Sequence, residues 1–134
     1  MKIIPFENIS NCILIIILVL TFSSCAQEKK CSEFKVGTFE YSDPKFSEWK
    51  VNRTDSTQIE ISTKSGIEIF SSIEWKNDCE YVLTYKKVLN SGSDVNDLVG
   101  QTIQVEIVET KSDRYTCKSK SDVMDLELEM VKID

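Results

Sequence analysis

Apolar and polar side chains alternate along most of the chain after residue 30, which is the period-2 pattern of half-buried β-strands. The clearest run covers residues 123–132, where methionine or leucine alternates with aspartate or glutamate. No long apolar segment with the helical period of 3.6 residues appears in this part of the chain. The pattern predicts about eight strands, at residues 34–41, 48–53, 57–63, 67–75, 79–88, 102–110, 114–120 and 123–132.

Turn-forming residues separate these runs at intervals of roughly ten residues. Short strands at that spacing predict an all-β domain, an antiparallel meander that forms a small lipocalin-like barrel or a sandwich. Phe34 and Phe39 are out of phase within the first run, so we expect a β-bulge at Gly37. Residues 94–100 are the one segment expected to hold a helical turn, with Gly100 at its end.

The first 24 residues have the layout of an export signal. An uncharged stretch at residues 12–22 follows a short leading segment with one lysine, and it is too short to favour an uncleaved membrane anchor. The residues before Cys25 are Phe22, Ser23 and Ser24, which resembles the bacterial lipobox. That resemblance implies cleavage before Cys25 and lipidation of its thiol and amine, whereas ordinary cleavage near Ala26 is the alternative.

These boundaries predict a cleaved lipoprotein signal peptide (1–24), a lipidated cysteine with a polar tether (25–32) and one β domain (33–134). We expect the domain to be exported and lipid-anchored in the cell envelope, at the outer membrane, as a monomer. Removing residues 1–24 takes away one basic and one acidic residue, so the net charge stays at -6. An acidic domain without a basic stripe is repelled by phosphate backbones, which disfavours nucleic-acid binding.

Three cysteines remain after Cys12 is removed with the signal and Cys25 is lipidated. In an oxidising compartment one disulfide and one spare thiol are expected. We favour a disulfide between Cys31 and Cys79, which leaves Cys117 as a thiol on a strand. A zinc site is disfavoured because the chain has no histidine and no C-x₂-C pair.

Residues 31–88 carry a pattern of cysteines and aromatic residues at fixed offsets. The motif C-x₂-F-K-x-G-x-F-x-Y begins at Cys31, an arginine and Q-x-E follow at Arg53 and Gln58, and I-x-W-x₂-D-C-x-Y-x-L begins at Ile73. This pattern resembles a family of small secreted bacterial lipoproteins that has no assigned activity. Some members are labelled DNA topoisomerase IV, but a domain of about 110 residues is too small for a DNA gate and an ATPase domain. The resemblance supports the pairing of Cys31 with Cys79, since both belong to the pattern.

The sequence gives little support for catalysis. Histidine is absent, and no Gly-rich phosphate loop or nucleophile motif occurs. Acidic pairs such as Glu74 with Asp78, or Glu127 with Glu129, are more typical of a solvated strand face than of acid/base catalysis. Residues 94–97 together with Asp113 lack the calcium-binding pattern of an EF-hand. We therefore expect no catalytic residue, no metal and no cofactor, and we interpret Cys117 as a buried or incidental thiol.

Arg53, Gln58 and Glu60 flank the turn at residues 54–56, and two interpretations of them stay open. The simpler one is a cross-strand ion pair between Arg53 and Glu60. The alternative places Arg53 and Gln58 inside a barrel, where they orient a ligand among aromatic residues. The candidate lining residues are Phe39, Tyr41, Arg53, Gln58, Trp75, Tyr81 and Tyr85.

The function that the sequence favours is a non-enzymatic envelope lipoprotein that binds a ligand or another envelope protein. A small apolar ligand inside the domain is the leading hypothesis. The alternative is a structural, partner-binding lipoprotein with a solid core, which acts through edge strands or its acidic face. An enzyme is the third and most remote hypothesis.

Overall fold

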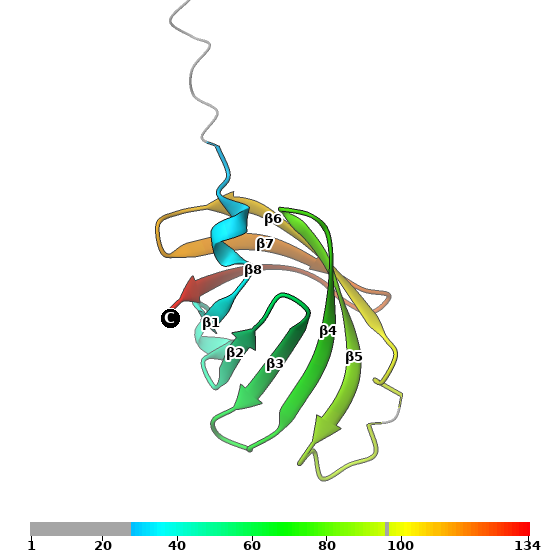
Figure 1. The fold of residues 1–134 in the computed structure, drawn as a ribbon. Helices are drawn as coiled ribbons and strands as arrows, with labels where there is room; N and C mark the ends of the chain where they lie inside the picture. The colour runs from blue at the N-terminus through cyan, green and yellow to red at the C-terminus, as the bar shows by residue number, and fades with distance from the viewer. Residues whose placement is uncertain (1–27, 96) are drawn as a thin grey trace, which may run out of the picture.

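Residues 28–95 and 97–134 of the computed structural model fold into one antiparallel β-barrel (Figure 1). The signal segment, Cys12 and Cys25 lie outside the described residues, so cleavage and lipidation stay predictions. No helix among the described residues is long and apolar enough to cross a membrane. The strands are β1 (Gly37–Tyr41), β2 (Trp49–Arg53), β3 (Thr57–Ser62), β4 (Glu68–Asn77), β5 (Glu80–Leu89), β6 (Thr102–Thr110), β7 (Arg114–Lys120) and β8 (Asp125–Lys132).

Each strand pairs with the next one along the chain, and β1 pairs with β8 to close the barrel. The closing ladder places Phe39 opposite Lys132 and Tyr41 opposite Met130. The prediction of an all-β meander is confirmed, and the structure is the barrel rather than the sandwich. Closure gives every strand two neighbours, which limits edge-to-edge association, although residues 86–89 of β5 extend past the β5–β6 ladder that ends at Thr84.

The chain before β1 differs from the prediction. Cys31–Phe34 form a short 3-10 helix, η1, instead of the start of the first strand. Gly37 begins β1 at φ +143°, where a Cβ atom would meet the backbone oxygen of Asp134 at 2.6 Å. Pairing with β2 is continuous from Gly37 to Glu40, so the expected bulge is wrong. Phe34 and Phe39 are out of phase because Phe34 lies in η1 and Phe39 lies in the strand.

The predicted helical turn at residues 94–100 is a pair of hydrogen-bonded turns. Leu98 N–H donates to Val95 O at 2.9 Å, and Gln101 N–H donates to Leu98 O at 3.1 Å. Gly100 ends the segment at φ +91°, the left-handed conformation that favours glycine. The segment therefore stops where the sequence indicated, without forming a helix among its described residues.

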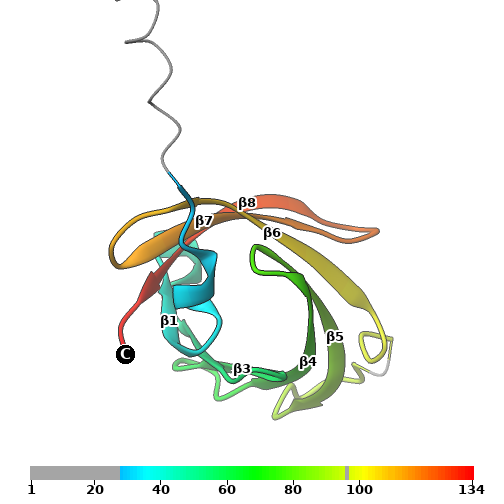
Figure 2. The same ribbon diagram turned by 45° about the horizontal axis from the view of Figure 1, so that its top comes forward.

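The helix η1 covers one end of the barrel, beside β1 (Figure 2). A disulfide joins Cys31 in η1 to Cys79 in the β4–β5 turn, as expected, and Cys117 is a free, buried cysteine. Phe34 is 1 % exposed, and its ring lies 5.3 Å from that of Tyr115. We call this the capped end. The loops β1–β2, β3–β4, β5–β6 and β7–β8 lie at the opposite, open end, because successive turns of a meander alternate between ends.

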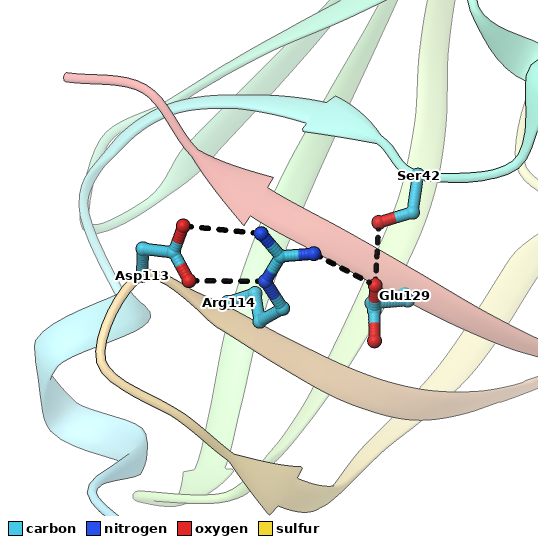
Figure 3. Close-up of polar contacts among 4 residues, drawn as sticks. All are labelled: Ser42, Asp113, Arg114 and Glu129. Carbon is cyan, nitrogen blue, oxygen red and sulfur yellow. Dashed lines mark hydrogen bonds and ion pairs between the residues drawn. The ribbon is translucent and has the colours of Figure 1, made fainter.

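A polar network on the outer face supports the β7–β8–β1 closure (Figure 3). Arg114 forms two contacts with Asp113, at 3.0 and 3.2 Å, and one with Glu129 at 3.2 Å. The Ser42 hydroxyl donates to the same Glu129 oxygen at 2.7 Å. Arg114 lies on β7, Glu129 on β8 and Ser42 just after β1, so the network joins three neighbouring strands.

Candidate ligand-binding cavity

A cavity of about 170 Å³ lies inside the barrel, and every strand contributes at least one residue to its wall. Most of the wall is apolar, formed by Leu83, Ile103, Val105, Leu128 and Met130 among others. Phe46, in the short 3-10 helix η2 (Pro44–Phe46) between β1 and β2, and Met124, between β7 and β8, lie at the open end. Arg53 and Tyr115 lie towards the capped end. The cavity therefore has an apolar body and a polar base beneath η1.

Arg53 forms the centre of the polar base. Its Nε donates to Gln58 Oε1 at 2.9 Å, and its Nη1 donates to the backbone oxygen of Phe34 in η1 at 3.0 Å. Its Nη2 donates to the hydroxyls of Tyr81 at 3.1 Å and Tyr115 at 2.9 Å. These contacts join strands β2, β3, β5 and β7 to η1, so a single side chain links the base of the barrel to its cap.

The guanidinium of Arg53 is also enclosed by aromatic rings. It lies 4.6 Å from the ring centre of Phe39, 5.0 Å from that of Tyr81 and 5.8 Å from that of Tyr115. Burial by itself lowers the pKa of Arg53, but contacts with Tyr115 and Tyr81 outweigh it and raise the pKa above its ordinary value. Burial likewise raises the pKa of both tyrosines, which keeps their hydroxyl protons in place. The base of the cavity is thus a permanent cation with two neutral hydroxyls.

The register between β2 and β3 explains why Arg53 lies inside. Arg53 is opposite Gln58, while Glu60 is opposite Val51. Of the two interpretations left open for these residues, the cross-strand ion pair between Arg53 and Glu60 is wrong, because Gln58 occupies the position that faces Arg53. Val51 and Arg53 share one face of β2, and both are buried, at 0 and 4 % exposure.

Glu60 lies higher in the cavity, two residues closer to the open end than Gln58. It accepts a hydrogen bond of 2.6 Å from the hydroxyl of Tyr41 on β1. Burial raises the pKa of Glu60 above its ordinary value, although the Tyr41 hydrogen bond and the charge of Arg53 oppose the rise. Burial and the Glu60 charge together raise the pKa of Tyr41 well above its ordinary value. The pair is a second polar position, separate from the base.

Five of the seven residues expected around a ligand line this cavity, namely Tyr41, Arg53, Gln58, Tyr81 and Tyr85. Phe39 and Trp75 lie elsewhere. Phe39 is 0 % exposed and packs edge-on against Tyr115, with the guanidinium of Arg53 over its ring. Trp75 packs on Tyr81 at 4.6 Å with Lys35 over its ring, and its buried indole nitrogen has no hydrogen-bond partner among the described residues.

Strand β7 supplies lining residues that the sequence did not single out as site residues. Tyr115, Cys117 and Ser119 alternate on the inner face, and all three border the cavity. Their period-2 spacing was the available signal, but a tyrosine, a cysteine and a serine do not form an apolar run. Burial raises the pKa of Cys117 to about 11, so it is a thiol at neutral pH.

The acidic pairs considered from the sequence have other partners. Glu74 pairs with Lys76 at 2.9 Å and Asp78 with Lys35 at 2.8 Å, all on the outer surface. Glu129 belongs to the Arg114 network. In the part of the chain that the structure describes, no three Cys, Asp or Glu side chains are grouped so as to hold a metal ion.

Comparison with family models, with curated proteins and with solved structures gives no match for this chain. A functional assignment therefore depends on the cavity and on the residues that line it.

Proposed function

We propose that this chain is a non-enzymatic, lipid-anchored protein of the cell envelope whose barrel binds a small, largely apolar ligand in its interior. The observation that supports the proposal most strongly is the cavity of about 170 Å³, which has an apolar wall and a few convergent polar groups. Ligand sites have this composition, since apolar side chains supply contact area and a few polar groups fix the orientation.

The cavity volume limits the size of the ligand. A protein cavity of about 150 Å³ accommodates one benzene molecule. Sites for drug-sized molecules are larger, at about 300–1,000 Å³. The interior of this barrel therefore suits a molecule of about six to ten heavy atoms, such as a short acyl chain or a single substituted ring.

Lipidation at Cys25 would set the orientation of the barrel. Cys31 is fixed to the capped end by its disulfide, and Lys30 N–H donates to Thr110 Oγ1 at 2.8 Å at the same end. The six-residue step from Cys25 to Cys31 reaches at most about 20 Å. The capped end would then face the membrane, and ligand would enter from the aqueous side. We expect an outer-membrane location.

The alternative hypothesis, a partner-binding lipoprotein with a solid core, has less support. The eight described strands form a closed ring, so each has two neighbours, and a partner could pair only along strand ends such as residues 86–89 of β5. The interior contains a cavity of about 170 Å³ next to a packed cluster of buried residues. The acidic outer face remains available to a partner, and it is the surface on which this hypothesis now depends.

An enzyme is the third hypothesis, and titratable groups in the cavity bear on it. Burial raises the pKa of Tyr81, Tyr115 and Cys117, which moves each group away from the ionised form that a base or nucleophile needs. Glu60 also has a raised pKa, but its nearest polar partner is the hydroxyl of Tyr41. These shifts favour binding without chemistry.

A cavity-filling variant tests ligand binding. Ser119→Phe adds an aromatic ring to the inner face of β7, whereas Lys118→Phe adds the same ring to the outer face. We expect Ser119→Phe to abolish binding of a six-carbon ligand and Lys118→Phe to retain it, both with a folded barrel by circular dichroism. Equal binding by both variants would show that the ligand lies outside the barrel.

Metabolic labelling with a radioactive fatty acid tests the anchor. The wild-type chain should be labelled and Cys25→Ala should not be. Cys31→Ala serves as the control, because it removes a neighbouring cysteine that is not the expected lipid acceptor. Equal labelling of wild type and Cys25→Ala would contradict the lipidation proposal.

A further inference from the structure

We infer that the ligand is a small monocarboxylate, held with its carboxylate against Arg53, Tyr81 and Tyr115 and its apolar tail directed towards the open end. The inference deepens the proposed function and rests on it. It names the chemical class of the ligand and its orientation in the barrel.

The hydrogen-bond donors at the base exceed the acceptors that the described residues provide. Arg53 has five N–H groups, of which Nε uses one, Nη2 uses two and Nη1 uses one. One N–H on Nη1 is left over. The hydroxyls of Tyr81 and Tyr115 both accept from Arg53 and lie 3.5 Å apart, so their mutual contact uses only one of the two hydroxyl protons. Two donors thus remain for an acceptor from outside.

The charge at the base is not part of an ion pair. None of the ion pairs among the described residues includes Arg53, whose acceptors are all neutral oxygens. Glu60, an acidic residue of the cavity wall, is stabilised in its charged form by Arg53, but it lies closer to the open end and accepts its hydrogen bond from Tyr41. A buried cation is costly unless an anion or several hydrogen bonds compensate it. A carboxylate would supply both a negative charge and acceptors for the two spare donors.

The rest of the cavity determines the tail. Leu83, Ile103, Val105 and Met130 form most of the wall between the polar base and the open end, and the hydrogen-bonded Tyr41–Glu60 pair is its polar part. An inorganic anion would leave this apolar space unfilled. A carboxylate with a tail of about five or six carbons fills a cavity of this volume and removes its own apolar surface from water. Hexanoate is therefore a suitable probe.

Other head groups fit the base less well. An alcohol can accept the spare hydrogen bonds but adds no negative charge beside Arg53. An amine would be repelled by Arg53 and would have to bind at Glu60 instead. The three molecules hexanoate, 1-hexanol and hexylammonium each have a straight chain of six carbons, so the comparison changes the head group at constant carbon number.

Nuclear magnetic resonance of the ¹⁵N-labelled full chain in detergent micelles provides the readout. The sequence has two arginines, Arg53 in the cavity and Arg114 on the outer face, and each gives one side-chain Nε–H signal. We expect hexanoate to shift the Arg53 signal saturably and to leave the Arg114 signal unchanged. We expect hexanoate to bind at least tenfold more tightly than 1-hexanol, because hydrogen bonds to a charged acceptor are the stronger ones.

Tyrosine variants test how many hydroxyl donors the site needs while Arg53 stays in place. Tyr81→Phe and Tyr115→Phe each leave one hydroxyl whose proton is no longer shared, so each should retain hexanoate binding within about threefold. The double variant has no hydroxyl donor and should bind hexanoate at least tenfold more weakly. Arg114→Met is the matched control, since it removes the other arginine, and it should leave binding unchanged.

The outcomes separate this inference from the proposed function. If 1-hexanol binds as tightly as hexanoate, or if hexylammonium binds most tightly, the carboxylate assignment is wrong while the cavity still binds a ligand. If none of the three shifts any signal of a cavity residue, both proposals fail. If either single tyrosine variant loses binding as fully as the double variant, the donor count is wrong and the proposed head-group site is overturned.

Discussion

Removal of the Cys31–Cys79 disulfide should destabilise the barrel by a large fraction of its total stability. The two cysteines are 48 residues apart in sequence. In the chain-entropy model, opening a loop of this length releases enough denatured-state entropy to cost about 4 kcal/mol at 25 °C. Small domains are stable by about 5–15 kcal/mol, so the double variant Cys31→Ala/Cys79→Ala should be close to the lower limit of stability.

The effect should be concentrated at the capped end. Cys31 is 2 % exposed, and the Phe34 oxygen accepts a hydrogen bond from Arg53. Without the disulfide, η1 is held by the Phe34 ring, by this bond and by lysine contacts. Lys132 Nζ donates to the η1 oxygen of Glu33 at 3.0 Å, Lys35 pairs with Asp78, and the two lysines before η1 contact β6. We therefore expect the Arg53 Nε–H to exchange with solvent faster in the variant than in wild type. The increase should be larger than the loss of global stability alone would cause.

Urea denaturation of residues 26–134, followed by far-ultraviolet circular dichroism, measures the loss. Oxidised wild type should unfold with a free energy about 4 kcal/mol above that of the double variant. Reducing agent should shift wild type to the variant value and leave the variant unchanged. A difference below about 1 kcal/mol would refute the reasoning, because it would mean that the disulfide does not restrict the denatured chain.

The pKa values of buried Glu60 and Cys117, and of the carboxylates around Arg114, can each be tested. Burial raises the pKa of Glu60 in the folded state above its value in the unfolded chain, so protonated Glu60 favours folding. The stability of wild type should therefore fall as the pH rises from the unfolded-state pKa of Glu60 through its folded-state pKa. Glu60→Gln should lack this fall in urea titrations. Alkylation of Cys117 by N-ethylmaleimide should accelerate up to about pH 11 and should slow when hexanoate is bound. Arg114→Met should raise the pKa of Asp113 and Glu129 towards ordinary values, as measured by carboxyl-carbon resonances.

Each of these has a contrary outcome. An equal pH dependence in wild type and Glu60→Gln would place the titrating group elsewhere. Alkylation of Cys117 that levels off near pH 9, the ordinary pKa of a thiol, would show that it is not buried as described. Unchanged carboxyl pKa values in Arg114→Met would mean that the network in Figure 3 does not persist in solution.

The sequence predicts the strands well because their hydrophobic period is local. Each strand boundary except the first lies within about two residues of its expected place. Closure between β1 and β8 could not be predicted, since it depends on how the ends of the meander meet. The start of β1 was misplaced because the disulfide and the buried Phe34 ring fold residues 31–34 back over the barrel.

The candidate site was only partly predictable, for a different reason. Alternation places Phe39 and Tyr41 on the same inner face of β1, but only depth along the barrel decides which borders the cavity. Phe39 lies beneath η1 in the packed base, and Tyr41 lies nearer the open end. Arg53 shares its face with Val51, yet a charged side chain usually lies outward, so its position depended on the register with Gln58.

Contacts between a bound ligand and the methionine methyl groups test the central proposal most directly. The chain has three methionines, and both that lie in the β domain, Met124 and Met130, border the cavity. With the methyl groups labelled by ¹³C and hexanoate added, we expect nuclear Overhauser effects from its alkyl protons to the methyl groups of Met124 and Met130. Binding of hexanoate without contacts to either methyl group would contradict a ligand site inside the barrel.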